Sequence, residues 1–155
     1  MRTANCAMAV VLLLLAGGCG SMNPDLRALG QYGGTGVRDV PRSVTFAGRQ
    51  VDDDRFAQAW VYLDRYGVRD LDLSGCNITD DSVSLMMQLD RLEKLSLQGT
   101  KITPAGLMRL HNLPRLRLLV IEPGMLSDTQ RQDLQAALRG TRLQEKPYAR
   151  LEPQH

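Results

Sequence analysis

Apolar residues recur along this chain in one frame, Leu-x-Leu-x-x-x-x-Ile, and the frame returns every 24 residues. Its three copies comprise Leu71, Leu73 and Ile78; then Leu95, Leu97 and Ile102; then Leu119, Ile121 and Leu126. A weaker copy, with Val44, Phe46 and Val51 in the same positions, precedes them at an offset of 27 residues. Fixed periods of about 20 to 50 residues indicate a repeat architecture, in which each unit buries its apolar face only by stacking on its neighbours.

Each copy divides into a strand, a polar turn and a helix. The Leu-x-Leu stretch alternates apolar and polar residues, which predicts a short strand with one buried face. Thr79, Thr103 and Ser127 then mark helix starts, because their side chains can accept a hydrogen bond from the first helical turn. Pro104 suits the first helical position, and Gln130 completes a capping box with Ser127. Apolar residues three apart on one helical face predict the core: Val83, Met86 and Leu89; Leu107, Leu110 and Leu113; Leu134 and Ala137.

The copies read VRDLDLSGCNITDDSVSLMMQLDR from Val68, LEKLSLQGTKITPAGLMRLHNLPR from Leu92 and LRLLVIEPGMLSDTQRQDLQAALRG from Leu116. They resemble leucine-rich repeats of the frame LxxLxLxx(N/C/T)x(I/L)T, and ITDDS and ITPAGLMRL resemble helices common in bacterial members. The resemblance implies an α/β fold over residues 41–142. The fold that it implies is a short leucine-rich-repeat solenoid of about four strand-turn-helix repeats, with a parallel sheet on its concave face. Such repeats host many unrelated binding roles, so the resemblance implies little about function.

Residues 1–18 have the pattern of a signal peptide, which is excluded from the fold. Arg2 supplies the positive charge, and the apolar run over residues 7–15 is shorter than the roughly 20 residues that span a bilayer. The stretch that ends this segment, Leu-Ala-Gly-Gly-Cys up to Cys19, resembles the lipobox of bacterial lipoproteins. The resemblance implies a diacylglyceryl group on Cys19 and cleavage before it. Ala16 stands where the lipobox usually has leucine, so an ordinary signal peptide cleaved nearby is the alternative.

The residues after Cys19 predict where the chain is anchored. Gly20 in place of aspartate favours, within the lipoprotein resemblance, the outer membrane. We therefore expect a lipid-anchored protein of the bacterial cell envelope that faces the periplasm. Durable attachment needs more than one acyl chain, such as palmitate. Residues 19–40 are rich in glycine and poor in apolar residues, which predicts a flexible tether with a span of roughly 25 Å.

Charge and cysteine content exclude several classes of function. With 19 basic and 17 acidic residues, the chain lacks the basic excess typical of nucleic-acid-binding proteins. Cys76 is the one cysteine left for the folded domain, so it has no intramolecular disulfide partner. Its place in the turn favours a structural thiol over a redox or dimer-forming role. We expect no cofactor and no small-molecule substrate.

No set of residues suited to catalysis or metal binding is present in the sequence, and we predict that the protein is not an enzyme. His111 and His155 lack a second ligand at zinc-site spacing. No Gly-x-Ser-x-Gly, Walker-type or His-Glu-x-x-His motif occurs. The run Asp52-Asp53-Asp54 could bind calcium, but it precedes a helix, where the helix dipole favours acidic side chains.

Outward-facing strand residues of successive copies should align in columns along the concave face. One column reads Thr45, Asp72, Ser96 and Val120, and its neighbour reads Ala47, Ser74, Gln98 and Glu122. On the fourth strand Leu118 and Val120 face outward although they are apolar. Either the C-terminal tail, residues 143–155 with Tyr148 and Leu151, covers them as a cap, or they belong to a partner site. The candidate protein-binding residues are Asp72, Ser96, Gln98, Leu118, Val120 and Glu122.

The expected function is non-catalytic binding of another protein through this concave face. The alternative is a structural or assembly subunit of an envelope complex that associates through its repeat ends. Aromatic residues in the first helix motivate that alternative, because they suit either a cap on the open end of the core or a binding patch. This cluster consists of Phe56, Trp60, Tyr62, Leu63 and Tyr66.

Overall fold

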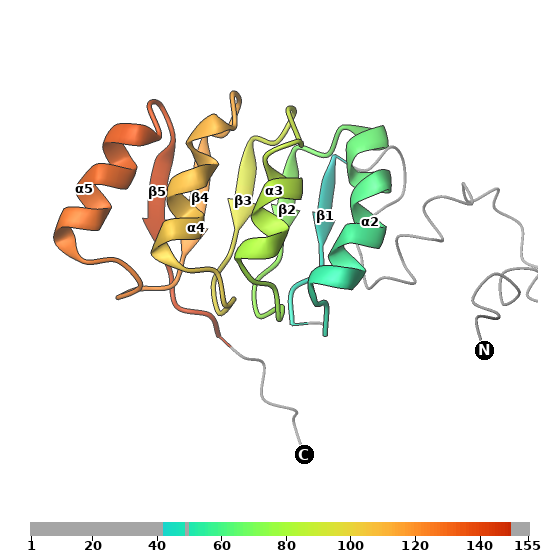
Figure 1. The fold of residues 1–155 in the computed structure, drawn as a ribbon, viewed down its shortest axis with the longest axis horizontal. Coiled ribbons are helices and arrows are strands. Elements are labelled where there is room, and N and C mark those ends of the chain that lie inside the picture. Colours follow the sequence, from blue (N-terminus) through green and yellow to red (C-terminus); the bar gives the residue numbers. More distant parts are fainter. Residues whose placement is uncertain (1–41, 49, 150–155) are drawn as a thin grey trace, which may run out of the picture.

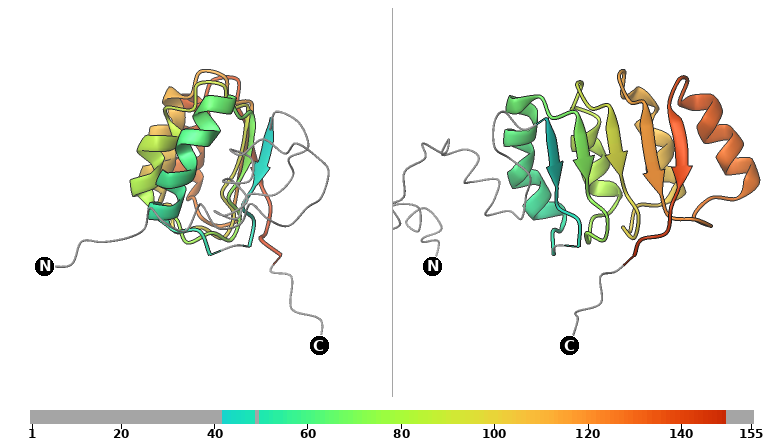
Figure 2. Two further views of the ribbon diagram at one scale, coloured as in Figure 1. Left: turned by 90° about the vertical axis from the view of Figure 1, so that its right-hand side faces the viewer. Right: turned by 180° about the vertical axis from the view of Figure 1, so that it is seen from behind.

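The computed structural model describes residues 42–48 and 50–149, which form a sheet with a row of helical segments on one face (Figures 1 and 2). The strands are all parallel and lie in chain order: β1 Ser43–Thr45, β2 Asp70–Asp72, β3 Lys94–Ser96, β4 Leu118–Ile121 and β5 Arg142–Glu145. The helical segments are α2 Asp53–Tyr66, η1 Asp80–Ser82 with α3 Val83–Met86, α4 Pro104–Arg109 with η2 Leu110–Asn112, and α5 Asp128–Ala137. This architecture confirms the predicted short solenoid. The predicted signal peptide, Cys19 and the tether lie outside the described residues, as does Leu151.

The strands pair so that equivalent residues of successive repeats are neighbours. Leu71 lies opposite Val44 and Leu95, and Leu95 lies opposite Leu119. All four side chains are buried between the sheet and the helices. A slip of one residue would turn each of them to the other face, so their burial fixes the register. The predicted column of Thr45, Asp72, Ser96 and Val120 is confirmed by the same pairing.

The helix starts follow the predicted caps. The Thr79 and Thr103 hydroxyls accept hydrogen bonds from the amides of Asp81 and Gly106, both at 3.3 Å. Ser127 and Gln130 form the predicted capping box. Between these caps the helical segments are short, and the second repeat has only the η1 turn and one turn of α-helix in α3. Packing onto the sheet therefore stabilises these segments more than helix propensity does.

Aspartates at the first helical position connect one repeat to the next. Asp53 accepts hydrogen bonds from the amide of Thr79 at 3.0 Å, the Thr79 hydroxyl at 2.9 Å and the Ser82 hydroxyl at 2.5 Å. Asp80 repeats the arrangement one unit later and accepts from the amide and the hydroxyl of Thr103 at 2.8 and 2.6 Å. Pro104 stands at the equivalent position of the third unit, where it offers no carboxylate. The contacts therefore join the first three helix starts only.

A fifth strand extends the sheet beyond the four copies read from the sequence. β5 pairs with β4 along its length, although its residues fall almost entirely in the stretch assigned to the tail. Leu143 continues the register after Leu119, but the next inward position holds Glu145 where β4 has Ile121. The Glu145 carboxylate pairs with the Arg131 guanidinium of α5 at 2.8 Å. This ion pair replaces an apolar contact at the end of the core, which is why the apolar frame did not reveal the strand.

We predict that Asp53→Asn lowers the free energy of unfolding by about 1–2 kcal/mol at neutral pH, since hydrogen bonds to charged groups contribute about 1.5–3 kcal/mol and this carboxylate is partly exposed. Burial alone would raise the pKa of the Asp53 carboxyl, but hydrogen bonds from Ser82 and Thr79 outweigh it and lower the pKa below the ordinary 3.8. Stability from a lowered pKa is complete above the unfolded value and is lost as the pH falls through the folded value. The deficit, measured by urea unfolding, should therefore disappear in acid.

The matched control is Asp54→Asn, which changes the same charge in the same helical turn at an exposed side chain. Equal losses of stability for the two variants would contradict the role given to the Asp53 contacts.

Candidate functional site

The strand face, which we define as the face of the sheet without helices, carries all six predicted binding residues. Asp72, Leu118 and Glu122 are half-buried there. The other three are buried, with Ser96 and Gln98 each 7% exposed and Val120 5% exposed. A partner would therefore touch the half-buried members directly.

The chain's own C-terminal segment, residues 146–149, lies across the ends of the strands on this side. The Lys146 amide donates to the carbonyl of Ile121 at 3.0 Å, which continues the sheet for one residue. The side-chain amide of Gln98 donates to the Lys146 carbonyl at 3.0 Å. The Glu122 carboxylate accepts from the Tyr148 amide at 3.1 Å. Two of the predicted binding residues thus hold the backbone of an extended segment.

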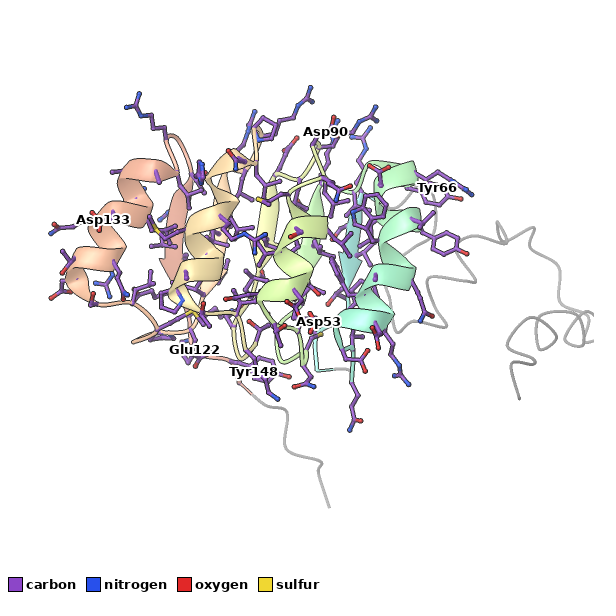
Figure 3. The ribbon with its side chains drawn as sticks, viewed as in Figure 1. Asp53, Tyr66, Asp90, Glu122, Asp133 and Tyr148 are labelled. Carbon is purple, nitrogen blue, oxygen red and sulfur yellow. The ribbon has the colours of Figure 1, made fainter. Side chains whose placement is uncertain are left out.

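The ring of Tyr148 lies against a row of glycines in the turns that follow the strands. A Cβ on Gly75 would overlap the phenol ring, and a Cβ on Gly99 would lie 3.0 Å from Tyr148 Cδ1. Gly48 of the first turn approaches the phenol oxygen in the same way. All three glycines have positive φ, at 69°, 71° and 63° for residues 48, 75 and 99, so glycine suits both the turn and the close approach of the ring. Figure 3 shows Tyr148 at the same edge as Glu122 and Asp53.

A polar chain links the middle of the strand face to this segment. Ser74 Oγ donates to Asp72 Oδ1 at 2.6 Å and also lies 2.9 Å from Oε1 of Gln98. The Asp72 carboxylate accepts from the Ser74 amide as well, at 3.0 Å. Because Gln98 then reaches the Lys146 carbonyl, the polar side chains of two successive repeats act together in positioning the segment.

The part of the strand face nearer the strand starts is more open. Asp70 and Leu118 are half-buried, and Lys94 between them is exposed. Arg142 of β5, also exposed, lies on the other side of Leu118 in the register. An apolar side chain with charged neighbours on both sides forms a small mixed patch, and we call these four residues the open patch.

Most side chains of the aromatic cluster in the first helix pack in or against the core. Phe56 and Leu63 are fully buried. The Trp60 indole N–H donates to the Leu85 carbonyl of α3 at 2.8 Å, so this ring joins the first repeat to the second. Val61 is the exposed large apolar side chain of this helix, at 47%. The capping interpretation of the cluster fits these contacts better than a free aromatic patch.

The residues weighed for other chemistry have structural contacts. The Cys76 thiol is buried and donates to the Phe46 carbonyl at 3.2 Å, as a structural thiol in the turn would. Asp52 caps α2 by accepting from the Arg55 amide at 3.0 Å, while Asp53 faces the next repeat, so the acidic run does not converge on one point. Within residues 42–48 and 50–149, no cluster of three metal-ligating side chains occurs. The same residues contain no helix with the length and apolar character needed to cross a membrane.

Sequence reasoning missed the contacts of Tyr148 and the contribution of β5 to the strand face. The signals were present: Leu143 lies 24 residues after Leu119, and glycine occupies the same turn position in successive copies. Neither signal says that a distant segment folds back over the turns. That contact depends on where β5 directs the chain.

We predict that Tyr148→Ala releases residues 146–148 from the strand ends. Removing a half-buried aromatic ring should cost on the order of 1–2 kcal/mol locally, so the amides of Lys146 and Tyr148 should exchange with solvent roughly tenfold faster. Amide hydrogen exchange measures this directly. Tyr148→Phe is the control, because it keeps the ring that contacts the glycines. Unchanged exchange in the alanine variant would mean that the ring does not hold the segment.

Comparison with known proteins agrees with the fold and adds little on function. The family model described as Leucine Rich repeat matches residues 68–87, which comprise β2, the following turn and the helical segment of the second repeat, η1 with α3. No curated protein matches the chain. Leucine-rich repeats typically serve as non-catalytic protein-binding modules, so a role in protein interaction is supported. The matched repeat and the five parallel strands together agree with one fold class, a short α/β solenoid of leucine-rich-repeat type.

Proposed function

We propose that the protein is a lipid-anchored envelope protein whose repeat domain binds another protein through the strand face. The supporting observation is that this face already binds an extended peptide within the same chain. Gln98 and Glu122 engage a carbonyl and an amide of residues 146–148, while the glycine row accepts a side chain. These are the kinds of contact by which proteins recognise extended segments.

The open patch is the surface that we assign to the partner. Leu118 supplies the apolar contact, and Lys94 and Arg142 flank it with positive charge. Asp70 completes the row beside Lys94. A partner that places an apolar side chain beside an acidic one would match this arrangement, because central apolar contacts with a charged rim are typical of protein interfaces.

We predict that the double variant Lys94→Glu/Leu118→Asp loses its partner while it keeps its fold. Its capture of envelope proteins should fall at least about tenfold, since the loss of interface hot spots costs about 2 kcal/mol or more. The measurement is in-cell crosslinking followed by quantitative mass spectrometry, with thermal unfolding as the check on folding. Val120 is left unchanged because it is buried, and a charge there would test stability instead.

The matched control is Lys101→Glu, an exposed lysine in the turn after β3 at the other end of the repeat. If capture survives in the double variant and is lost in this control, the strand face is not the binding surface.

The membrane part of the proposal comes from the lipobox-like sequence before Cys19. It supports acylation of Cys19, removal of residues 1–18 and, through Gly20, residence in the outer membrane. The proposed tether, residues 19–40, lies just before β1 in the sequence, so an anchor at Cys19 would hold the domain by its first strand.

We predict that the mature protein begins at Cys19 and carries acyl chains, and that Cys19→Ala abolishes both features. Intact-mass measurement of the detergent-extracted protein checks this prediction. An unmodified N-terminus at a neighbouring residue would favour the ordinary signal peptide instead, without bearing on the strand face.

The rival role, a structural subunit joined through its repeat ends, has one supporting feature in Val61 at the exposed side of α2. Trp60 is unsuitable as its test, since its indole is bonded within the domain. A Val61→Asp variant that disperses a larger complex would favour this role over partner recognition by the strand face.

A further inference from the structure

Basic side chains concentrate at the edge of the molecule where the strands begin. We call this the strand-start edge; it comprises the ends of the helical segments and the loops that lead into the strands. Besides Arg65 in the last turn of α2, it carries six exposed arginines: Arg42, Arg91, Arg115, Arg117, Arg139 and Arg142. Among the described residues, no ion pair engages any of the six. Nearby Arg69 differs, because it pairs with Glu93 at 3.4 Å.

Three of these arginines repeat with the fold. Arg91, Arg115 and Arg139 each lie three residues before a strand, at β3, β4 and β5. Neighbouring strands of a sheet are about 4.8 Å apart, so the repeat aligns these loops in a row. A row of cations along one edge can contact a flat anionic surface at several points at once.

The opposite edge, where the strands end, has the reverse charge. Asp53, Asp80 and Asp128 lie there at the starts of helical segments, and Glu122 directly follows β4. With Asp52, Asp54 and Asp81 these acidic residues outnumber the basic residues of the same edge, Arg55, Lys101 and Lys146. Figure 3 shows Asp53, Glu122 and Tyr148 on this edge and Asp90, the neighbour of Arg91, on the strand-start edge. The charges therefore separate along the strand direction, and a charged surface would orient the domain.

The proposed tether joins the domain at the basic edge. The described chain begins at Arg42, immediately before β1, and Arg42 is itself one of the six arginines. A lipid at Cys19 would keep this edge within reach of the membrane. A flexible tether of roughly 25 Å would not by itself choose which edge faces the lipid. The arginines would make that choice.

We propose that the strand-start edge docks on the anionic phosphate headgroups of the membrane that holds the acylated chain. This inference rests on the lipid anchor of the proposed function. In the docked orientation the strands run away from the membrane, so the strand face is roughly perpendicular to the membrane surface. The acidic edge, with Tyr148, then points away from the membrane. Each basic residue near an anionic surface adds to the attraction, and the attraction is screened by salt.

The test uses the acylated full-length protein in two kinds of vesicle. One contains phosphatidylcholine alone, and the other contains about one-third phosphatidylglycerol, chosen because the attraction scales with anionic lipid. A fluorophore is attached at Asn112→Cys on the strand-start edge or at Ala105→Cys on the other edge, both exposed and uncharged. Cys76 is buried and should stay unlabelled. Nitroxide on the lipid headgroups quenches whichever label approaches them.

In anionic vesicles we expect the Asn112 label to be quenched about threefold more than the Ala105 label. The difference should vanish in neutral vesicles, which lack anionic headgroups. It should also vanish in 1 M salt, because the Debye length there is only about 3 Å. The variant Arg91→Gln/Arg115→Gln/Arg139→Gln should also abolish it. The charge-matched control, Arg55→Gln/Lys101→Gln/Lys146→Gln, removes three exposed cations elsewhere and should preserve it.

Equal quenching of the two labels in anionic vesicles would overturn the inference, as would a difference that survives in neutral vesicles or in the arginine variant. Flotation of the vesicles in 1 M salt reports the anchor separately. A chain that does not float there lacks acyl attachment, which contradicts the proposed function. For such a chain, flotation at low salt still tests whether the strand-start edge binds anionic lipid. The arginine variant must then lose binding to anionic vesicles, and the charge-matched control variant must keep it.

Discussion

The register that places Leu71, Leu95 and Leu119 side by side is the constraint on which the other features of the molecule depend. A strand of three or four residues has little stability alone, and each of these side chains is buried only because the neighbouring repeats are in place. The same register aligns everything that repeats with it. It brings Asp53 to Thr79 and forms the glycine row under Tyr148. It also sets the arginines before successive strands.

Much of the fold follows from local sequence because strand, turn and helix start each have their own signal. Alternation located β2, β3 and β4, and Thr79, Thr103 and Ser127 located the helix starts that the structure confirms. β5 was not predicted, because its second inward residue is Glu145 and a charged residue at that position does not fit the apolar frame. The Arg131 guanidinium of α5 pairs with this half-buried carboxylate at the end of the core. A periodic pattern of apolar residues does not reveal an ion-pair partner ten or more residues away in the sequence.

The candidate site was predictable in position but not in its contacts. Counting residues placed Asp72, Ser96 and Val120 in one column, because parallel pairing conserves the repeat. The repeat spacing does not predict how exposed each of these side chains is. Gln98 is nearly covered because its amide meets the Lys146 carbonyl, a contact that depends on where the chain goes after β5. The open patch around Leu118 is what remains accessible once that segment is in place, so both its extent and its chemistry come from tertiary structure.

The most direct test of the account is a site-specific photo-crosslinking comparison in living cells. A photoreactive residue would replace Asp70 on the strand face in one protein and Gln132, exposed on α5, in another. We predict that the first yields a discrete crosslinked adduct with one envelope protein, while the second yields none. Adducts formed only from Gln132 would show that the helical side recognises the partner, which contradicts the claim that the strand face is the binding surface.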